Sequence, residues 1–397
     1  MKKLLLASAA TLAAGAAIAQ DGANEIKMGV ILGFTGPIES LTPAMATGAE
    51  MAMAEVTEAG TLLEGMTVTP VRADSTCVDS AAATAAAERL ITAEGVKGIM
   101  GADCSGVTGA VLANVAVPNG MVMISPSATS PALTSAEDNG LFFRTAPSDA
   151  RQGLVLAEVL DDKGISEVAV TYTNNDYGKG FADAFQAAFE DMGGMITLSA
   201  AHEDGKADYT AEVGALASAG GEALVVLGYV DQGGAGVIQA ALDTGAFDMF
   251  AFGDGMIGDA LTDSFGDGIE GSVGTAPGSD NEGGAMFAEM ASEAGIDGTS
   301  VYAGESYDAA SLMLLAMQAA GSHEPGDYAA HIFDVANAPG EPILPGELGK
   351  ALEILADGGE IDFQGATGVE LVEPGEAAGS YAEYVIEDGA LSVVGYR

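Results

Sequence analysis

The sequence predicts an α/β fold made of two units of similar size, each with a parallel central sheet. Short runs of β-branched residues alternate with Ala-rich runs of helical periodicity along most of the 397 residues. Alternation of this kind is typical of parallel strands joined by right-handed helical connections. The pattern stops near 143–148 and then starts again, with no Pro- or Gly-rich linker between the halves. We therefore expect two closely coupled units.

The first unit is expected to contain four strands and two long helices. The strands are predicted at 27–32, 67–71, 96–100 and 122–124. One helix begins at about Pro43, because apolar side chains recur there at helical spacing. Its inward face is predicted to carry Met45, Ala49, Ala52 and Val56. The other helix begins at about Ser80 and stops at Gly95.

The second unit repeats the alternation, and a C-terminal region follows it. Helices are predicted at 154–160, 181–189, 209–217 and 236–242, and strands at 168–172, 195–199, 224–227 and 250–252. From Val273 onward we expect a strand and then helices around 286–294, 307–320 and 328–335. Two extended runs, 381–386 and 391–396, flank Asp388-Gly389 and predict a hairpin.

The charge balance excludes one class of partner. The chain has 13 basic and 58 acidic residues, a net charge of −45, so its field repels nucleic acid and anionic lipid. Only 18% of residues are charged, so the imbalance reflects scarce Lys and Arg and indicates adaptation to a salty environment. The hydrophobic content of 48% and mean hydropathy of +0.28 exclude disorder as the main state.

Residues 1–19 are predicted to be a cleaved signal peptide. Lys2 and Lys3 precede an apolar stretch over 4–18, and Ala17-Ile18-Ala19 has the form of a cleavage site. A transmembrane anchor fits less well, because the stretch is short and ends in that signal. We expect export, with a periplasmic location.

The two cysteines of the chain are expected to be oxidised to a disulfide in an oxidising compartment. Cys77 and Cys104 are expected to form a disulfide that stabilises the fold by about 3–4 kcal/mol, with two buried free thiols as the alternative.

No metal site is expected, since His202, His323 and His331 do not stand at ligand spacing. No cofactor is expected either. The sequence has no phosphate-binding loop, nucleophile elbow or zinc-protease motif, so an enzyme is not expected.

The predicted binding residues follow the strands, because ligands of parallel sheets bind beyond the carboxyl ends of the strands. The segments concerned are 101–108, 125–134, 174–178, 228–234 and 253–256. Hydroxyls such as that of Ser105 can donate to a carboxylate, and Asp254 between two glycines can accept from an ammonium group. Together they would bind a zwitterion. The alternative is ordinary turn and helix-cap chemistry.

A series of short motifs runs in order along the chain. They lie at 28–37, 48–50, 77, 104–105, 124–131, 143–145, 177–180, 229, 254–255, 307–309 and 363–368. In this order and spacing the chain resembles the periplasmic solute-binding proteins of ABC importers of the leucine/isoleucine/valine-binding type. That resemblance implies the type I periplasmic binding fold, in which two Rossmann-like lobes are joined by three hinge crossovers.

The resemblance also implies how the chain is divided. The crossovers are expected near Thr145, Thr275 and Val372. Lobe 1 would then hold 21–145 and 276–372, and lobe 2 would hold 146–275 and 373–397.

Four residues of lobe 1 are carried over from the family as ligand contacts. Ser105 and Thr129 match residues whose hydroxyl and backbone N–H groups hold an α-carboxylate. Ser127 matches a position whose carbonyl receives the ammonium group, and Ala128 is counted with the same loop.

Four aromatic and acidic positions complete the implied site. Tyr229 matches a tyrosine near the ammonium group, and Asp254 falls where the family has a countercharge. Tyr177 and Tyr302 match aromatic positions that flank the ligand.

Two positions depart from the family pattern. Asp103 stands where members that bind aliphatic ligands have an apolar residue, and Leu41 stands where they have an aromatic one. A buried, unpaired carboxylate facing an aliphatic side chain would cost several kcal/mol. Either Asp103 points away and caps the following helix, or the ligand carries a polar or cationic group. The preferred ligand therefore stays open.

The resemblance implies a monomeric protein that captures a small molecule between its lobes. We expect an amino acid, branched-chain or related, which is delivered to an ABC permease in the inner membrane. The alternatives are an amide, urea or aromatic acid as ligand, a periplasmic sensor, and an enzyme.

Overall fold

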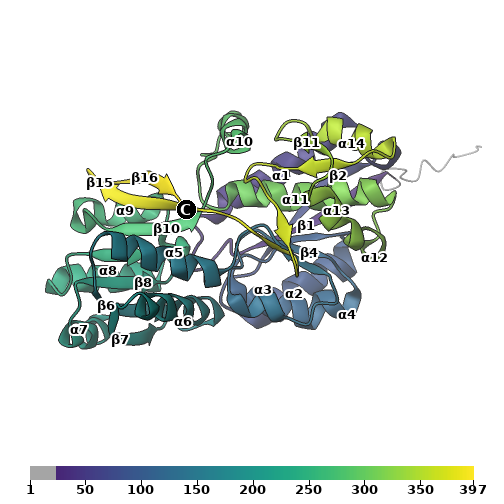
Figure 1. Cartoon of the computed structure of the whole chain (residues 1–397). Coiled ribbons are helices and arrows are strands. Elements are labelled where there is room, and N and C mark those ends of the chain that lie inside the picture. Colours follow the sequence, from purple (N-terminus) through teal and green to yellow (C-terminus); the bar gives the residue numbers. More distant parts are fainter. Residues whose placement is uncertain (1–23) are drawn as a thin grey trace, which may run out of the picture.

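Two seven-stranded sheets form the framework of the protein, seen here in a computed structural model that describes residues 24–397 (Figure 1). The first sheet has the order β13-β14-β5-β4-β3-β1-β2 and the second the order β16-β15-β10-β9-β8-β6-β7. This arrangement confirms the predicted α/β fold with two mostly parallel sheets. The expected signal peptide, 1–19, lies outside the described residues.

The first sheet is parallel except at its β13–β14 edge. Its strands are β1 (Glu25–Leu32), β2 (Thr67–Asp74), β3 (Ile99–Gly101), β4 (Met123–Ser125), β5 (Phe142–Arg144), β13 (Leu371–Val372) and β14 (Glu376–Ala377). Its helices are α1 (Thr42–Ala59), α2 (Ser80–Arg89), α3 (Ser105–Val111), α4 (Val117–Asn119), α10 (Glu282–Glu293), α11 (Ala303–Ala320), α12 (Pro325–Tyr328), α13 (Ile332–Ala336) and α14 (Leu348–Ala356). A small parallel pair, β11 (Glu341–Ile343) and β12 (Ile361–Phe363), lies beside them.

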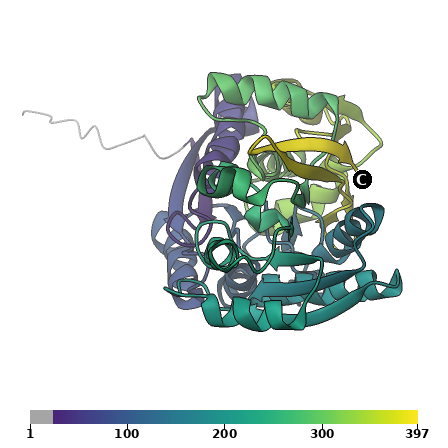
Figure 2. The same cartoon turned by 90° about the vertical axis from the view of Figure 1, so that its left-hand side faces the viewer.

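The second sheet is parallel from β7 to β10 and ends in the predicted hairpin. Its strands are β6 (Glu167–Thr173), β7 (Met195–His202), β8 (Ala223–Leu227), β9 (Phe250–Phe252), β10 (Val273–Pro277), β15 (Tyr381–Glu387) and β16 (Ala390–Tyr396). Its helices are α5 (Asp149–Asp162), α6 (Asp176–Asp191), α7 (Thr210–Ala219), α8 (Gly233–Thr244) and α9 (Asp259–Phe265). Figure 2 looks onto this half, with the yellow hairpin below the green helix α10.

Helix α11 forms the centre of the first half and packs against α1 (Figure 1). Every residue from Ala303 to Gln318 is buried. Close approach of the two helices depends on Gly48 of α1, because a Cβ there would lie 2.3 Å from the carbonyl oxygen of Ala303. The predicted helix 307–320 is thus confirmed, but the predicted helix 328–335 is interrupted by a 3₁₀ turn at 329–331.

The chain passes from one sheet to the other three times. The first passage follows β5. The second follows Pro277, because 276 and 277 still pair with β15 in the second sheet. The third follows Ala377, because β14 pairs with β5 at Glu376 and Arg144. Residues 373–377, expected in lobe 2, therefore lie on the first sheet, since strands of two residues leave no periodic pattern in the sequence.

We propose a corresponding division into lobes. Lobe 1 holds 24–145 and 278–377, and lobe 2 holds 146–277 and 378–397. This division follows sheet membership, because each sheet and the helices on it bury a continuous core.

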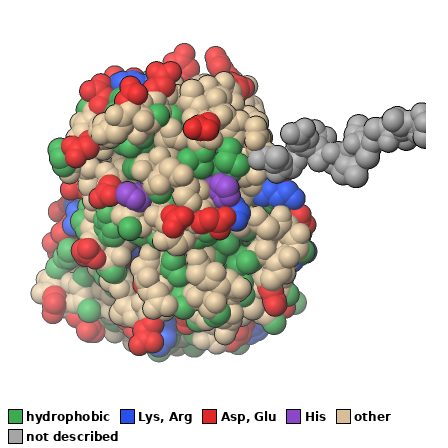
Figure 3. All heavy atoms as spheres, turned by 90° about the vertical axis from the view of Figure 1, so that its right-hand side faces the viewer, with side chains coloured by type: hydrophobic (Ala, Val, Ile, Leu, Met, Phe, Trp, Pro, Cys, Tyr) green, Lys and Arg blue, Asp and Glu red, His purple; other side chains and the backbone are tan. Residues whose placement is uncertain are grey.

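Acidic side chains are spread over the surface. Figure 3 shows one face on which Asp and Glu outnumber Lys and Arg. Within residues 24–397, no helix has both the length and the apolar character needed to cross a membrane.

Candidate functional site

A small cavity of about 20 Å³ lies between the two halves of the molecule. It is lined by Ile38, Leu41, Asp103, Cys104, Ser105, Ser127, Tyr177, Tyr229, Asp254, Gly255 and Tyr302. Most of these follow strands β3, β4, β8 and β9, whose carboxyl ends face the cavity. Seven of the nine predicted ligand-binding residues line the cavity, whereas Ala128 and Thr129 are fully buried and are not among the lining residues.

The disulfide supports one wall of the cavity. Cys77 and Cys104 are bonded, with their Cα atoms 5.1 Å apart, so the predicted bond is confirmed and the free-thiol alternative is wrong. Cys104 is the N-cap residue of α3, and Ser105 is the first residue of that helix. The bond therefore holds the start of α3 to the loop that follows β2.

Asp103 uses both carboxylate oxygens inside lobe 1. Its Oδ2 accepts the N–H of Gly33 at 2.5 Å, and its Oδ1 accepts from the Ser75 hydroxyl at 2.9 Å and the Cys104 N–H at 3.0 Å. Burial raises the pKa of this carboxyl, and these hydrogen bonds oppose the rise. Asp103 thus ties three loops together. It is not the N-cap of α3, and its oxygens are already occupied.

The polar loop after β4 meets α3 at Ser105. The Ser105 hydroxyl accepts the N–H of Ser130 at 3.1 Å. The Ser127 hydroxyl donates to the Asp103 carbonyl at 3.1 Å. Ser105 can still donate its own proton, since a hydroxyl both donates and accepts. Hydroxyl groups of the two segments therefore lie at one end of the cavity.

Asp254 also lines the cavity, between aromatic side chains from both halves. Its Oδ1 accepts from the Tyr177 hydroxyl at 2.7 Å, and its Oδ2 accepts from the Tyr302 hydroxyl. The Tyr177 ring stacks on that of Tyr229, with centroids 5.2 Å apart. Burial is the main cause that raises the pKa of the Asp254 carboxyl.

Asp149 is a second buried carboxylate near Asp254, and the sequence analysis missed it. It is the first residue of α5, and neither carboxylate oxygen has a hydrogen-bond partner. Burial and the charge of Asp254 raise the pKa of Asp149 well above its usual range. The Thr129 hydroxyl is close enough to favour the charged form, but no well-formed hydrogen bond joins the two. An acidic residue in the first turn of a helix is so common that Asp149 carries no distinguishing signal in the sequence.

Two neighbouring buried carboxylates favour a cation beside them: Asp149 has no hydrogen-bond partner, and Asp254 accepts only from two neutral tyrosine hydroxyls. Like charges in a region of low dielectric constant destabilise each other, and each charge also loses its hydration. The Thr129 hydroxyl oxygen is a third buried acceptor there without a partner. A positively charged group in the cavity beside Asp254 would lower the electrostatic cost of both carboxylates.

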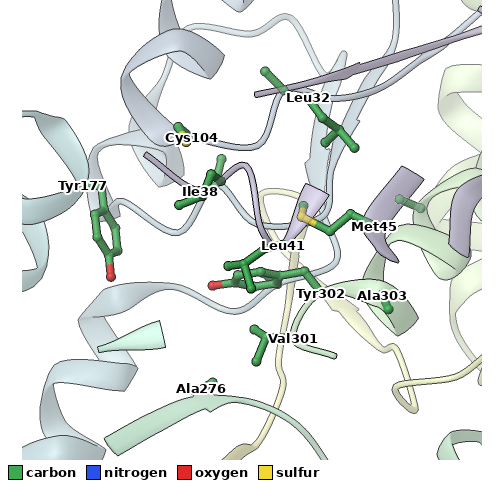
Figure 4. Packing of buried hydrophobic residues seen from close by; sticks show 14 of the residues in the cluster. Leu32, Ile38, Leu41, Met45, Cys104, Tyr177, Ala276, Val301, Tyr302 and Ala303 are labelled. Carbon is green, nitrogen blue, oxygen red and sulfur yellow. The ribbon is translucent and has the colours of Figure 1, made fainter. Parts of the chain in front are cut away.

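Aliphatic side chains close the remaining side of the cavity. Ile38 and Leu41 come from the loop between β1 and α1. Figure 4 shows Leu41 directly beside the Tyr302 ring, with Ile38 near Cys104. The position that differs from the family pattern, Leu41, thus contributes an apolar surface.

Hydrogen bonds hold the two halves together around the cavity. The Ser40 N–H donates to Asp231 Oδ2 at 2.8 Å, and the Asp231 N–H donates to the Pro37 carbonyl at 3.0 Å. At the opposite side, the Ser130 hydroxyl donates to the Asp176 carbonyl at 3.0 Å. The structure is therefore that of a closed molecule.

Two curated relatives come from Brucella melitensis. "Leu/Ile/Val-binding protein homolog 3" is 34% identical over 58% of this chain and 62% of its own length, so the match spans less than two thirds of that protein. "Leu/Ile/Val-binding protein homolog 1" is 29% identical over 90% of this chain and 98% of its own length.

Solved structures share the fold. A leucine-binding protein from Thermotoga maritima aligns with a TM-score of 0.78 at 23% identity, covering 94% of this chain and 98% of that one. A solute-binding protein of an ABC transporter from R. palustris, in complex with 4-hydroxybenzoate, aligns with a TM-score of 0.72 at 20% identity, covering 94% and 97%.

A family model described as "Periplasmic binding protein" matches residues 25–336, which contain every residue that lines the cavity. The two lobes, the closed cavity between them and this match lead to one conclusion. The chain belongs to the periplasmic binding protein family.

Proposed function

We propose that the protein is the substrate-binding component of an ABC importer and captures an α-amino acid with an aliphatic side chain. The observation that carries this proposal is the pair of buried carboxylates, Asp149 and Asp254, with both Asp149 oxygens unpartnered. A ligand ammonium group supplies the missing positive charge and up to three N–H donors. The names of the Brucella relatives support the same ligand class.

The hydroxyl end of the cavity suits the ligand carboxylate. Ser105 and Ser127 line this end, and Ser105 begins a helix whose first N–H groups have no partner within the helix. With the carboxylate there, the ammonium group is expected at Asp254, which lines the cavity, as the zwitterion hypothesis requires. Asp149 is fully buried and is not a lining residue, so it would act on the ammonium group through its charge. The family resemblance adds Thr129 to the groups that hold the carboxylate.

The ligand side chain is expected to contact Ile38 and Leu41. An aliphatic group buried against them gains roughly 25 cal/mol per Å² of apolar surface removed from water. Because the Asp103 oxygens are occupied by lobe 1, that carboxylate does not require a polar or cationic ligand side chain. Leucine, isoleucine and valine are therefore the first ligands to test.

An aromatic acid is the second candidate. The 4-hydroxybenzoate complex of a structural neighbour and the three tyrosine rings of this cavity favour it. An aromatic acid has no cation for Asp149 and Asp254, which is why the amino acid is preferred.

The cellular setting follows from the family and the N-terminal pattern. We infer that the protein works in the periplasm as a monomer, without catalysing a reaction, and delivers its ligand to a membrane permease. The cleavage-site pattern at 17–19 and the family match support this setting.

The test compares ligands that differ in one charged group. The purified protein is unfolded and refolded to remove any bound ligand, and melting and calorimetric titrations follow with L-leucine, 4-methylpentanoate and 4-hydroxybenzoate. A ligand at about a thousand times its Kd adds about 4 kcal/mol to stability, which gives a clear rise in Tm. We expect a rise with leucine and little with 4-methylpentanoate, which lacks the ammonium group. Equal responses to these two ligands would contradict the proposal.

A further inference from the structure

Arg144 is the one Lys or Arg side chain that is fully buried within residues 24–397, with 1% of its surface exposed. The chain has 13 basic residues against 58 acidic ones, so an interior arginine is a scarce positive charge. Arg144 ends strand β5, directly before the first passage between the lobes. Its guanidinium group has no role in the ligand contacts described above.

The guanidinium group bonds to the polar loop after β4. Nη1 donates to the carbonyl oxygens of Ala128 at 3.0 Å and Ser130 at 2.9 Å. Nη2 donates to the Thr134 hydroxyl at 2.8 Å and to Glu376 Oε2 at 2.5 Å. One side chain thus joins this loop to β14, the last strand before the third passage.

These bonds orient one backbone donor. The carbonyls of Ala128 and Ser130 are held by Arg144, and that of Thr129 accepts the Asp149 N–H at 2.9 Å. In a trans peptide, the N–H points away from the carbonyl. The Thr129 N–H is therefore directed away from Arg144, and it donates no hydrogen bond to any residue of 24–397.

We propose that Arg144 is a positioning residue for the ligand carboxylate: it holds the peptide between Ala128 and Thr129 so that the Thr129 N–H is free for that group. The inference rests on the proposed function in taking the ligand to be a carboxylic acid, and on the family resemblance in assigning that carboxylate to Thr129. Arg144 does not touch the ligand. It acts through the loop and adds a positive charge behind it.

The ion pair with Glu376 supports a role of this kind. Buried pairs seldom stabilise a fold more than well-packed apolar residues would, because both charges lose their hydration. Arg144 also makes two bonds to carbonyls and one to a hydroxyl, which apolar residues cannot replace. These bonds set the geometry of the loop.

The test uses a double variant that leaves no unpaired charge, Arg144→Met with Glu376→Gln. Arg151→Met is the matched control, because Arg151 is exposed on α5 and makes no bond to the loop. Calorimetric titration compares L-leucine with L-leucinamide, which keeps the ammonium group and the side chain but lacks the carboxylate. We expect leucine to bind at least tenfold more weakly to the double variant, and leucinamide to change by less than threefold.

A second readout follows the backbone directly. In the wild type, leucine should shift the amide proton of Thr129 downfield in a ¹⁵N-resolved NMR spectrum, as expected of a new hydrogen bond to a carboxylate. The double variant should lose this shift. Equal losses for leucine and leucinamide, or an unchanged shift at Thr129, would overturn the inference and leave Arg144 a purely structural residue.

The outcome separates this inference from the proposed function. If the wild type binds 4-hydroxybenzoate and not leucine, the proposed amino-acid ligand is wrong, and the same comparison is made with 4-hydroxybenzoate and its amide. If the wild type binds no carboxylic acid at all, both ideas fail.

Discussion

Replacing Asp149 by Asn should weaken ligand binding while leaving the ligand-free protein as stable as before, or more stable. The side chain keeps its shape and loses only its charge. Because neither Asp149 oxygen has a partner in the ligand-free protein, no hydrogen bond is lost. The substitution also removes repulsion with Asp254, which contributes to the raised pKa of Asp149.

The size of the binding effect follows from the charges. An ammonium group about 4 Å from a carboxylate gains about 4 kcal/mol at an effective dielectric constant of about 20. The positive charge of Arg144 already offsets part of the Asp149 charge. We therefore expect a loss of about 2–4 kcal/mol, or roughly a 30- to 1,000-fold higher Kd for leucine.

The pH dependence has the opposite sign to that of a salt-bridged carboxylate. The pKa of Asp149 is raised in the folded protein, so the folded state holds this proton more tightly than the unfolded chain does. Stability from this group is complete below the unfolded pKa of about 3.8 and falls as the pH rises toward the folded pKa. The ligand-free Asn variant should lack this decline.

The assay measures urea unfolding without ligand from pH 4 upward, and leucine binding by calorimetry at pH 7. Asp161→Asn is the control, because Asp161 is exposed near the end of the same helix. A variant at position 149 that binds leucine as tightly as the wild type would refute the assignment of this carboxylate to the ammonium site. So would a large drop in ligand-free stability, which would reveal an unrecognised hydrogen bond.

Three further predictions concern stability and closure. Reducing the Cys77–Cys104 bond should lower the free energy of unfolding by about 3–4 kcal/mol, and an unchanged urea midpoint with reductant would contradict this. Tyr302→Phe removes a hydrogen bond to Asp254 that joins the lobes, worth about 1.5–3 kcal/mol. Small-angle scattering should then show a larger radius of gyration without leucine and the wild-type value with it; equal radii without leucine would show that the bond does not hold the lobes closed. Gly48→Ala should destabilise the protein by about 1–3 kcal/mol through a clash with Ala303, whereas Gly214→Ala, in open space on α7, should raise the midpoint slightly. A similar change in both glycine variants would mean that α1 can shift.

Much of the site could be predicted from the order of the strands. Ser105, Ser127 and Asp254 each follow a predicted strand, and parallel strands bring their carboxyl ends to one edge. The structure places these three side chains around one cavity, as that reasoning requires. Ala128 and Thr129 are fully buried and are not among the lining residues, and the sequence could not show this because the N–H and carbonyl directions of a loop are not encoded in its periodicity.

Other features had no readable signal. Strands β13 and β14 have two residues each, so no periodic pattern in the sequence marks the end of the first sheet. The carboxylate of Asp103 has its hydrogen bonds satisfied by Gly33 and Ser75, which lie 70 and 28 positions away in the chain. Such partners come together only after the sheet has formed.

The sequence by itself determined the fold class, the order of the elements, the disulfide and the set of polar residues at the strand ends, because each depends on local pattern and spacing. Only the tertiary structure decided which of the buried carboxylates have hydrogen-bond partners. Asp103 and Asp149 are equally buried acids, but distant loops satisfy the first and leave the second without a partner. Hydrogen-bond satisfaction is a property of neighbours in space, and no local pattern in the chain records it.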